Sequence, residues 1–314
     1  MRILIIKPSS FGDIVHGLVV AERILSQLPG ARIDWVARDL FAGLVRASGL
    51  VEKVYEFHRS PRGFLQIVKQ LRSETYDTVL DFQGLARSGL MLLASRSKVK
   101  IGRFDGREGS RLFARIQTAP PSGTSPFHAI DILRQFQHSM GLENLSPGVL
   151  DFANSERPDF SVRKGSILLF PESRRPEKEW GGFGDLAKRL SSEFPEKEIV
   201  WLGTGTEPLQ DSLHGISALI DGRQKVSLVS LPALVRESSV TVANDSGPIH
   251  LAAAMNRPVV GVFGPTDPRC YGPYPLDRNI NRVVMAPDGN LATLECDRVF
   301  SEVKEVLLRQ ADSS

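Results

Sequence analysis

The chain has 314 residues, more than a single hydrophobic core usually spans, so two domains of about 150 residues each are expected. Its 41% hydrophobic and 24% charged residues are typical of a globular protein and exclude a mainly disordered chain. The net charge of +3 conceals an asymmetry, because residues 1–150 carry 20 Lys and Arg against 13 Asp and Glu, whereas residues 151–314 carry 19 against 23. The first half, at +7, is expected to face an anionic partner, and the second half is at −4.

The first half alternates β-branched strands with amphipathic helices. Strands are predicted at "RILIIK", "RIDWVA", "KVYEF", "DTVLDF" and "VKIGR", and helices near 14–28, 39–48, 63–74, 86–94 and 128–140. There is no basic block with interleaved aromatic residues and no nucleic-acid motif, so an acidic small molecule or lipid headgroup is favoured over nucleic acid as the anionic partner.

The second half repeats this alternation after a polar linker, "GLENLSPGVLDFANSERPDFSVRKG". Strands are predicted at "SILLF", "EIVWLG", "VTVAN" and "PVVGVFG", and helices near 183–194, 207–214, 230–237, 247–256 and 294–309. The pattern predicts an α/β protein of two doubly wound, Rossmann-like domains, 1–150 and 151–314, whose strand C-termini face a shared cleft.

Other protein classes are disfavoured by what the chain lacks. No 18 apolar residues run together, and the opening "MRILIIK" is too short for a signal-peptide core, so a soluble cytoplasmic protein without a transmembrane segment is expected. Cys270 and Cys296 are too few for a disulfide framework or a thiolate metal site. Neither a Walker motif nor a complete GxGxxG is present, which disfavours a P-loop NTPase.

The first loop of interest is "KPSSFGDIVH", in which Asp13 opens a helix directly after the first strand. Asp13 has two interpretations: it caps the helix, or it acts as a general base. Lys7 and the arginines of "HRSPRGF" and "DGREGSR", which include Arg59, Arg62 and Arg107, are candidates to gather an anionic acceptor. Taken singly, most of them are also explained as surface charges.

The loop "NDSGPIH" in the second half follows a buried strand and precedes a helix of small residues. Ser246 or Gly247 at the cap leaves free backbone N–H groups at the helix N-terminus, where phosphate binds readily. A capped helix that binds nothing is the alternative. The turn-rich "GPTDP" brings the Thr266 hydroxyl toward the same edge, and His250 lies on the first helical turn, where a packing role is equally consistent.

Two further loops carry charge. "FPESRRPEKEW" offers Ser173 and Lys178, and the lysine is suited to neutralising a diphosphate, although a solvated basic loop explains it too. Glu207 in "GTGTEP" is interpreted either as an acid in the first turn of a helix or as an acceptor for a ribose diol.

Four segments in order resemble glycosyltransferase family 9, the bacterial heptosyltransferases of lipopolysaccharide core assembly. They are "KPSSFGDIVH", "DFQGLARSGL", "EKEW" and "NDSGPIHLAAAMNRPVVGVFGPTDP". Within the family, the chain most resembles the members that add the first heptose to the Kdo of lipid A-linked core.

The resemblance implies a GT-B fold, with the acceptor bound by the first domain, the nucleotide sugar bound by the second, and a last helix that often packs back on the first domain. It implies inverting, metal-independent transfer from ADP-L-glycero-D-manno-heptose to a Kdo-lipid A acceptor at the inner membrane surface, with no cofactor. The residue roles that it implies are Asp13 as the general base, Ser173, Lys178, Glu207, Asp245, Ser246, Gly247 and His250 on the donor, and Lys7, Ser10, Arg59, Arg62 and Arg107 on the acceptor.

Three alternatives remain open on the sequence alone. The chain uses another nucleotide-hexose, it is a nucleotide-sugar epimerase of the same fold, or it is a noncatalytic nucleotide or lipid A binder in which Asp13 only caps its helix.

Overall fold

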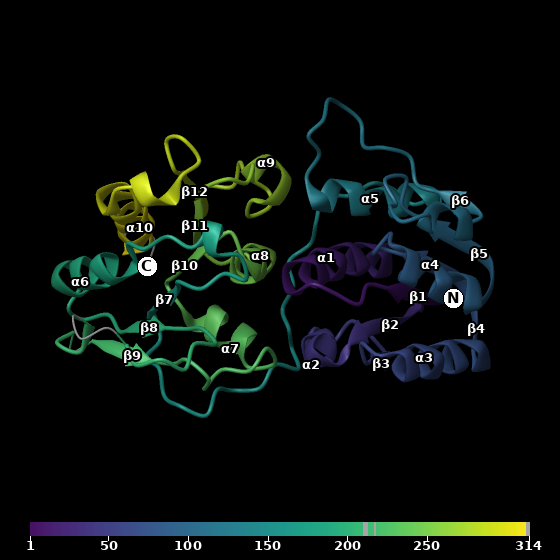
Figure 1. Cartoon of the computed structure of the whole chain (residues 1–314), viewed down its shortest axis with the longest axis horizontal. Helices are drawn as coiled ribbons and strands as arrows, with labels where there is room; N and C mark the ends of the chain where they lie inside the picture. The colour runs from purple at the N-terminus through teal and green to yellow at the C-terminus, as the bar shows by residue number, and fades with distance from the viewer. Residues whose placement is uncertain (210–212, 217, 312–314) are drawn as a thin grey trace. The chain divides into compact units, whose positions relative to one another are not determined.

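The computed structural model describes residues 1–209, 213–216 and 218–311. The chain divides into two compact units, Met1–Asn154 and Ser155–Ser314, and the division falls within the predicted linker 141–165. In Figure 1 the first unit runs from purple to teal and the second from teal through green to yellow.

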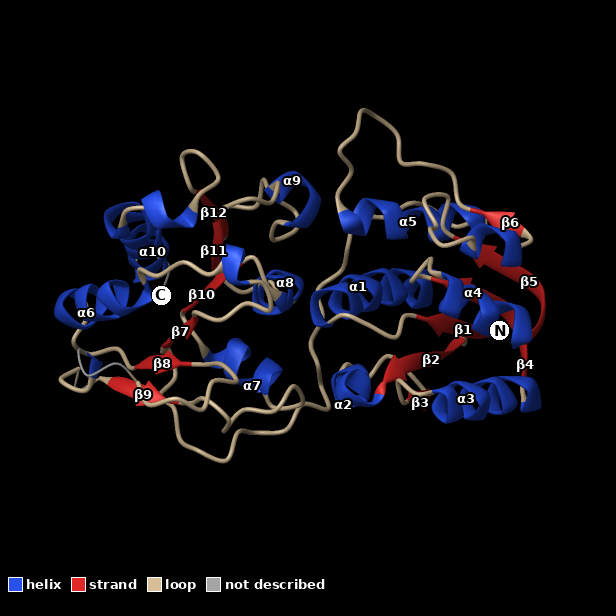
Figure 2. Ribbon diagram, in the orientation of Figure 1, coloured by secondary structure: helices blue, strands red, loops and turns tan. Residues whose placement is uncertain are grey.

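The first unit contains a six-stranded parallel sheet in the order β3-β2-β1-β4-β5-β6. Its strands are β1 (Arg2–Ile6), β2 (Arg32–Arg38), β3 (Lys53–Phe57), β4 (Thr75–Asp81), β5 (Arg96–Gly102) and β6 (Ile116–Gln117). Its helices are α1 (Phe11–Gln27), α2 (Asp39–Ala47), α3 (Pro61–Ser73), α4 (Ala86–Ala94), the 3-10 helix η1 (Ser110–Phe113) and α5 (Ala129–Ser139). Helix α1 packs against α2 and α5, and α3 packs against α4, so that helices cover the strands seen in red in Figure 2.

The central strand explains why this sheet is parallel and covered on both sides. Ile3, Leu4, Ile5 and Ile6 of β1 are all fully buried, although successive side chains of a strand point to opposite faces. A strand buried on both faces needs a continuous apolar run rather than an alternating one, and "ILII" supplies it.

The second unit repeats the same topology with the order β12-β11-β10-β7-β8-β9, again all parallel. Its strands are β7 (Ile167–Phe170), β8 (Ile199–Trp201), β9 (Leu219–Asp221), β10 (Val240–Asn244), β11 (Val259–Phe263) and β12 (Asn281–Met285). Its helices are η2 (Pro176–Lys178), α6 (Phe183–Glu193), α7 (Leu231–Glu237), α8 (Gly247–Ala254), α9 (Pro268–Tyr271), η4 (Leu291–Thr293) and α10 (Cys296–Ala311). The last helix, α10, packs against α6, β10, β11 and β12, and its Val299, Val303 and Leu307 belong to the core of this unit.

The structure adds elements that the sequence did not predict and corrects one that it did. The short strands β6, β9 and β12 were not predicted. The predicted helix 207–214 falls partly on residues 210–212, outside the described residues, and Glu207, Pro208 and Leu209 are not helical. The prediction that Glu207 starts a helix is therefore wrong.

Candidate active site

The first sheet changes direction between β1 and β4. From β1 the chain builds outward through β2 and β3, and from β4 it builds the other way through β5 and β6. In open parallel sheets, ligands bind beyond the strand C-termini at such a switch point, because the flanking loops diverge there. Lys7, Ser10 and Asp13 follow β1, and Asp81 ends β4 beside Ile6, so the structure places predicted site residues at this edge.

The Asp13 carboxylate is held by two neighbours. Its Oδ2 accepts hydrogen bonds from the Ser10 backbone N–H (3.1 Å) and the Ser10 hydroxyl (2.6 Å), and its Oδ1 lies 3.3 Å from Lys7 Nζ. The Lys7 side chain is 2% exposed, whereas that of Asp13 is 44% exposed. The carboxylate thus caps the start of α1 and remains open to solvent on another side, so the capping contact is present without closing off a role as a base.

The charges around Asp13 keep it ionised. Burial works against its ionisation, but the Lys7 ammonium and the Ser10 hydrogen bonds outweigh burial and lower the pKa of Asp13 below its ordinary value. Burial also lowers the pKa of Lys7, and Arg103 acts in the same direction, while Asp13 opposes both. The pair is therefore a mutually dependent ion pair with one buried partner.

Asp81 is a site residue that the sequence reasoning missed. Its side chain is 1% exposed, and it accepts hydrogen bonds from the backbone N–H groups of Gln83 and Gly84 and from the Ser88 hydroxyl, all at 3.0 Å. Burial raises the pKa of Asp81 despite these bonds. The signal was an acid at the end of an apolar strand, at the start of the motif "DFQGLARSGL".

Arg103, directly after β5, is a second residue that was missed. It binds Asp105 through Nε (2.8 Å) and Nη2 (2.7 Å), and its Nη1 donates to the Phe82 carbonyl at 3.3 Å. Burial works against its charge, but the Asp105 contacts outweigh burial and raise the pKa of Arg103. Because its charge acts on Asp13 and on Lys7, Arg103 belongs to the same electrostatic cluster.

The three predicted acceptor arginines are not all in one place. Arg107 is exposed, and its backbone N–H donates to the Gly84 carbonyl at 2.8 Å, so its loop adjoins the one after β4. Arg59 and Arg62 are exposed in the turn after β3 and the first turn of α3. Since β3 is the edge strand, two strands from β1, these two arginines lie farther along the sheet edge.

The second sheet has its switch point between β7 and β10, and the loops after these strands hold a second cluster. Lys178 Nζ lies 2.5 Å from Asp245 Oδ2, which also accepts a hydrogen bond from the Thr266 hydroxyl at 2.6 Å. The side chains of Lys178 and Asp245 are 15% and 6% exposed. Loops after three neighbouring strands, β7, β10 and β11, therefore meet at one buried carboxylate.

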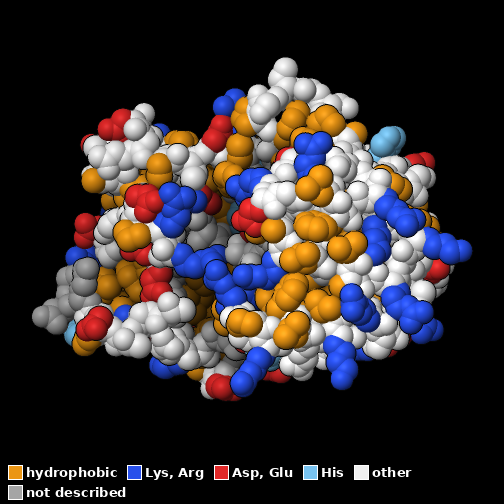
Figure 3. All heavy atoms as spheres, turned by 45° about the vertical axis from the view of Figure 1, so that its right-hand side comes forward, with side chains coloured by type: hydrophobic (Ala, Val, Ile, Leu, Met, Phe, Trp, Pro, Cys, Tyr) orange, Lys and Arg blue, Asp and Glu red, His pale blue; other side chains and the backbone are white. Residues whose placement is uncertain are grey.

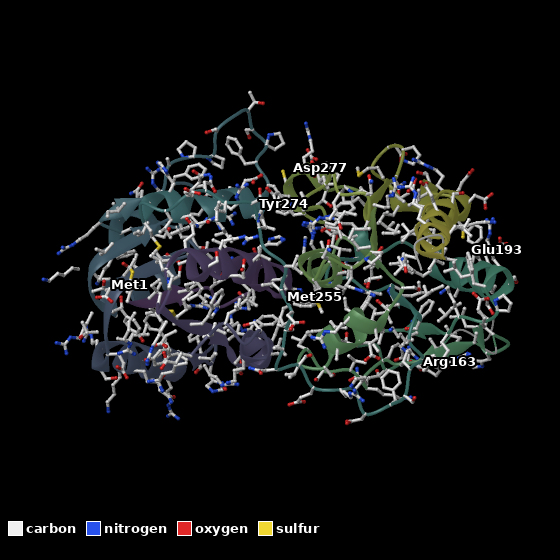
Figure 4. The ribbon with its side chains drawn as sticks, turned by 180° about the vertical axis from the view of Figure 1, so that it is seen from behind. Met1, Arg163, Glu193, Met255, Tyr274 and Asp277 are labelled. Carbon is white, nitrogen blue, oxygen red and sulfur yellow. The ribbon has the colours of Figure 1, made fainter. Side chains whose placement is uncertain are left out.

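Helix α8 starts within this cluster. Ser246 is its N-cap in extended conformation, Gly247 is its first residue, and Pro248 occupies the first turn, where no intrahelical N–H is needed. His250 is 9% exposed on the first turn. Met255, labelled in Figure 4, follows the last residue of this helix. The helix start thus carries backbone N–H groups of the kind that bind anions, and it follows Asp245, the partner of Lys178.

Ser173 and Glu207 lie in the neighbouring loops. The Ser173 backbone N–H donates to Glu179 Oε1 at 2.7 Å. Glu207 is exposed in the loop after β8, with its carbonyl accepting from Arg223 Nη1 at 2.7 Å. Glu172, which was not predicted, accepts from the Thr204 N–H and hydroxyl and from the next backbone N–H, and so ties the loops after β7 and β8 together.

The described residues contain no group of three or more His, Cys, Asp or Glu side chains placed to hold a metal ion. Cys270 and Cys296 are both free thiols. Burial raises the pKa of each thiol, so neither is poised as a thiolate.

Comparison with known proteins identifies the family. The model of glycosyltransferase family 9 (heptosyltransferase) matches residues 64–299. The chain belongs to glycosyltransferase family 9. It is thus an enzyme, a glycosyltransferase of the heptosyltransferase family, and the resemblance seen in the four sequence motifs is confirmed.

Individual relatives agree with this family over nearly the whole chain. Lipopolysaccharide heptosyltransferase 1 of Escherichia coli K12 is 25% identical across 98% of this chain and 100% of its own length. The structure of E. coli heptosyltransferase WaaC with ADP matches with a TM-score of 0.82 at 24% identity, covering 98% of this chain and 100% of that one. The same enzyme with ADP-2-deoxy-2-fluoro heptose matches with a TM-score of 0.80 at 24% identity, covering 97% and 99%. The predicted fold class, two Rossmann-like domains of the GT-B type, is confirmed.

Among the helices of the described chain, none is both long and apolar enough to cross a membrane.

Proposed function

We propose that the enzyme transfers heptose from ADP-L-glycero-D-manno-heptose to a Kdo-containing inner-core acceptor of lipopolysaccharide, with inversion and without a metal ion. The donor is suggested by the E. coli relative that was solved with ADP and with a fluorinated ADP-heptose. The acceptor class is suggested by the name of the relative from E. coli K12, lipopolysaccharide heptosyltransferase 1.

The observation that carries the proposal is the Asp13 carboxylate at the switch point of the first unit, fixed by Ser10 and Lys7 yet 44% exposed. A transferase needs a base aimed at the acceptor hydroxyl, and a fixed carboxylate with one open side meets that need. Because Lys7 lowers the pKa of Asp13, the carboxylate is ionised at neutral pH but is a weak base. It is suited to taking the proton late, once the bond to the anomeric carbon is largely formed.

The donor is assigned to the second unit. Breaking the bond between sugar and diphosphate builds negative charge on ADP, and that charge must be met by fixed cations and dipoles. Lys178 has three N–H donors, so it can keep its contact with Asp245 and still offer two to phosphate oxygens. The N–H groups at the start of α8, after Ser246, add the helix-terminal dipole.

The remaining residues are assigned to donor or acceptor by the loops in which they lie. Ser173 and His250 flank the diphosphate, and Glu207, in the loop after β8, accepts hydrogen bonds from the ribose diol. In the first unit, Arg107 beside the loop after β4, together with Arg59 and Arg62, receives the anionic acceptor. Such a reaction joins a water-soluble nucleotide sugar to a lipid-linked acceptor, which places it on the cytoplasmic face of the inner membrane.

Inversion follows from a single displacement. Asp13 removes the acceptor proton as the acceptor oxygen attacks the anomeric carbon, while ADP departs from the opposite face with its bonding electron pair. No covalent glycosyl-enzyme forms in this scheme, so one base and one anion site suffice.

The test is an incubation of the purified chain with ADP-heptose and Kdo₂-lipid A, followed by mass spectrometry of the lipid and quantification of ADP. The proposal expects one added heptose for each ADP released, and no ADP release without acceptor. Turnover of the donor in the absence of acceptor would instead indicate an epimerase, and transfer only from another nucleotide-hexose would change the donor. Binding of ADP without any transfer across the panel would indicate a noncatalytic binder.

A further inference from the structure

One face of the first unit combines exposed leucines with uncompensated positive charge. We define it as the α4–η1 face, made of exposed residues of α4, β5, η1, the loop after η1 and the start of β6. Its members are Arg87, Leu90, Leu93, Arg96, Lys98, Val99, Arg111, Leu112, Arg115 and Ile116.

Most of the charge asymmetry of the chain resides in this segment. Residues 86–117 contain eight Lys and Arg but only two acids, Asp105 and Glu108, a net charge of +6 out of the +7 carried by residues 1–150. Among the described residues, the only one of these eight cations in an ion pair is Arg103, which binds Asp105. The exposed cations of the face are therefore available to an anionic partner.

The apolar side chains of the face are too exposed to serve the core. Leu112 is 88% exposed, Leu93 56%, Ile116 42% and Leu90 41%. Figure 3, which brings the side of α4 and β6 forward, shows orange hydrophobic side chains among blue Lys and Arg side chains.

Contacts between these elements make the face continuous. Lys100 Nζ of β5 donates to the Leu93 carbonyl at the end of α4 (2.8 Å), and Arg111 Nε of η1 donates to Gln117 Oε1 of β6 (2.9 Å). Helix α4 and η1 approach so closely that a Cβ on Gly89 would lie 2.5 Å from the Phe113 ring.

The face also adjoins the candidate acceptor site. Ser88, in the first turn of α4, donates to Asp81, so this helix starts at the switch point and runs away from it. Leu93 lies seven residues beyond Ala86, about 10 Å along the helix at 1.5 Å per residue. A partner surface that contacts Leu93 would therefore lie within about two helical turns of the candidate acceptor site.

We propose that the α4–η1 face docks the enzyme on an anionic phospholipid surface, with Leu90, Leu93 and Leu112 entering the headgroup region and the surrounding cations binding lipid phosphates. A protein partner fits less well, because the centres of protein interfaces are depleted in charged residues, whereas this face carries five exposed cations, Arg87, Arg96, Lys98, Arg111 and Arg115. Alternating cations and protruding apolar side chains are the pattern of interfacial membrane binding. The purpose of such docking rests on the proposed lipid-linked acceptor, but the docking itself is measured without donor or acceptor.

The test is sedimentation of the full chain with vesicles of phosphatidylcholine alone or of equimolar phosphatidylcholine and phosphatidylglycerol. We expect binding to the anionic vesicles only, weakening as ionic strength rises from about 0.05 to about 0.5 M because the charges are screened. Replacing Arg111 and Arg115 by Ala should lower the partition coefficient about fivefold for each cation. Replacing Leu93 and Leu112 by Ser should lower it about tenfold or more, since both lose apolar burial.

Matched controls lie in the second unit. Leu308→Ser changes a leucine that is 49% exposed on α10, and Lys164→Ala removes an exposed cation before β7; both should bind vesicles as the wild type does. An unchanged melting temperature shows that each variant is folded.

The proposal is overturned if the wild type binds neither vesicle or binds both equally, or if the controls lose as much binding as the face variants. It is equally overturned if the face variants change only self-association measured by analytical ultracentrifugation, which would assign the face to a second copy of the chain. A wild-type enzyme that transfers heptose but ignores vesicles would refute docking and leave the proposed function standing. Vesicle binding without heptose transfer would support docking and refute the proposed function.

Discussion

Lys178 and Asp245 form a buried ion pair, and replacing Lys178 should destabilise the protein more than replacing Asp245. Lys178→Met leaves the Asp245 carboxylate, 6% exposed, with the Thr266 hydroxyl as its remaining side-chain donor. Removing one partner of a buried pair typically costs about 3–5 kcal/mol, so we expect about 3 kcal/mol here, at the low end because Thr266 stays. For a unit of this size that corresponds to a fall in melting temperature of about 6–12 °C.

Replacing Asp245 instead of Lys178 should cost less folding stability. Asp245→Asn leaves a lysine that is 15% exposed on a flexible stem, which can turn its ammonium group toward water at a cost of about 1 kcal/mol. In the double variant no charge is stranded, so its loss of stability should be smaller than the sum of the two single losses by about 1–3 kcal/mol.

The assay is urea unfolding of the full chain followed by tryptophan emission, because the backbone N–H of buried Trp180 donates to Asn244, next to Asp245. The matched control is Lys188→Met, which removes an exposed pair with Asp185 (3.2 Å; 43% and 72% exposed) and should change stability by less than about 0.5 kcal/mol. If Lys178→Met costs no more than Lys188→Met, or if the single effects simply add, the pair is not the buried, coupled unit described above.

Three further predictions concern turnover. Lys7→Met should move the acid limb of the kcat/KM profile to higher pH, because the lost ammonium no longer lowers the pKa of Asp13; an unmoved limb would mean that Asp13 does not set it. In the wild type the lowered pKa means that the Lys7 contact stabilises the fold above the ordinary carboxyl pKa, and that this stability is lost as pH falls through the lowered value. Transfer should survive EDTA, and a complete loss that Mg²⁺ or Mn²⁺ restores would contradict the metal-free mechanism. Arg107→Ala should raise the acceptor KM severalfold while leaving the donor KM nearly unchanged, and equal effects on both would move the acceptor site elsewhere.

The doubly wound fold was predictable because its strands are encoded locally. "ILII" is a continuous apolar run and "VTVAN" is rich in β-branched residues, as strands buried on both faces are, and both form central strands. The strands that were missed, such as β6 (Ile116–Gln117), have two to five residues and pair only at sheet edges or after long loops, so no local periodicity marks them.

The site was predictable only in part, because some of it depends on contacts between residues that are far apart in the sequence. Asp13 stands out because it is an acid in the first turn of a helix that directly follows a strand. The Asp81–Arg103 cluster depends on β1, β4 and β5 lying side by side, which brings together residues more than 20 positions apart. Glu207 was assigned to a helix from a favourable first-turn acid, but the backbone of residues 207–209 is not helical, and Arg223 binds its carbonyl.

The central claim is heptosyl transfer with Asp13 as the base, and Asp13→Asn tests it most directly. Asparagine keeps an oxygen that can accept from the Ser10 N–H, so the cap on α1 should persist, but the amide cannot take a proton. Because Asn no longer neutralises the buried Lys7 ammonium, we expect a lower melting temperature, and turnover is therefore measured well below it, where the variant is folded. The measurement is the rate at which heptose appears on Kdo₂-lipid A and ADP is released, for wild type and variant, with ADP affinity measured in parallel. We predict transfer by the wild type, a fall in kcat of about 100-fold or more in the variant, and equal ADP affinity. A variant that keeps most of its turnover, or loses it only in step with unfolding, would contradict the account and leave Asp13 as a helix cap.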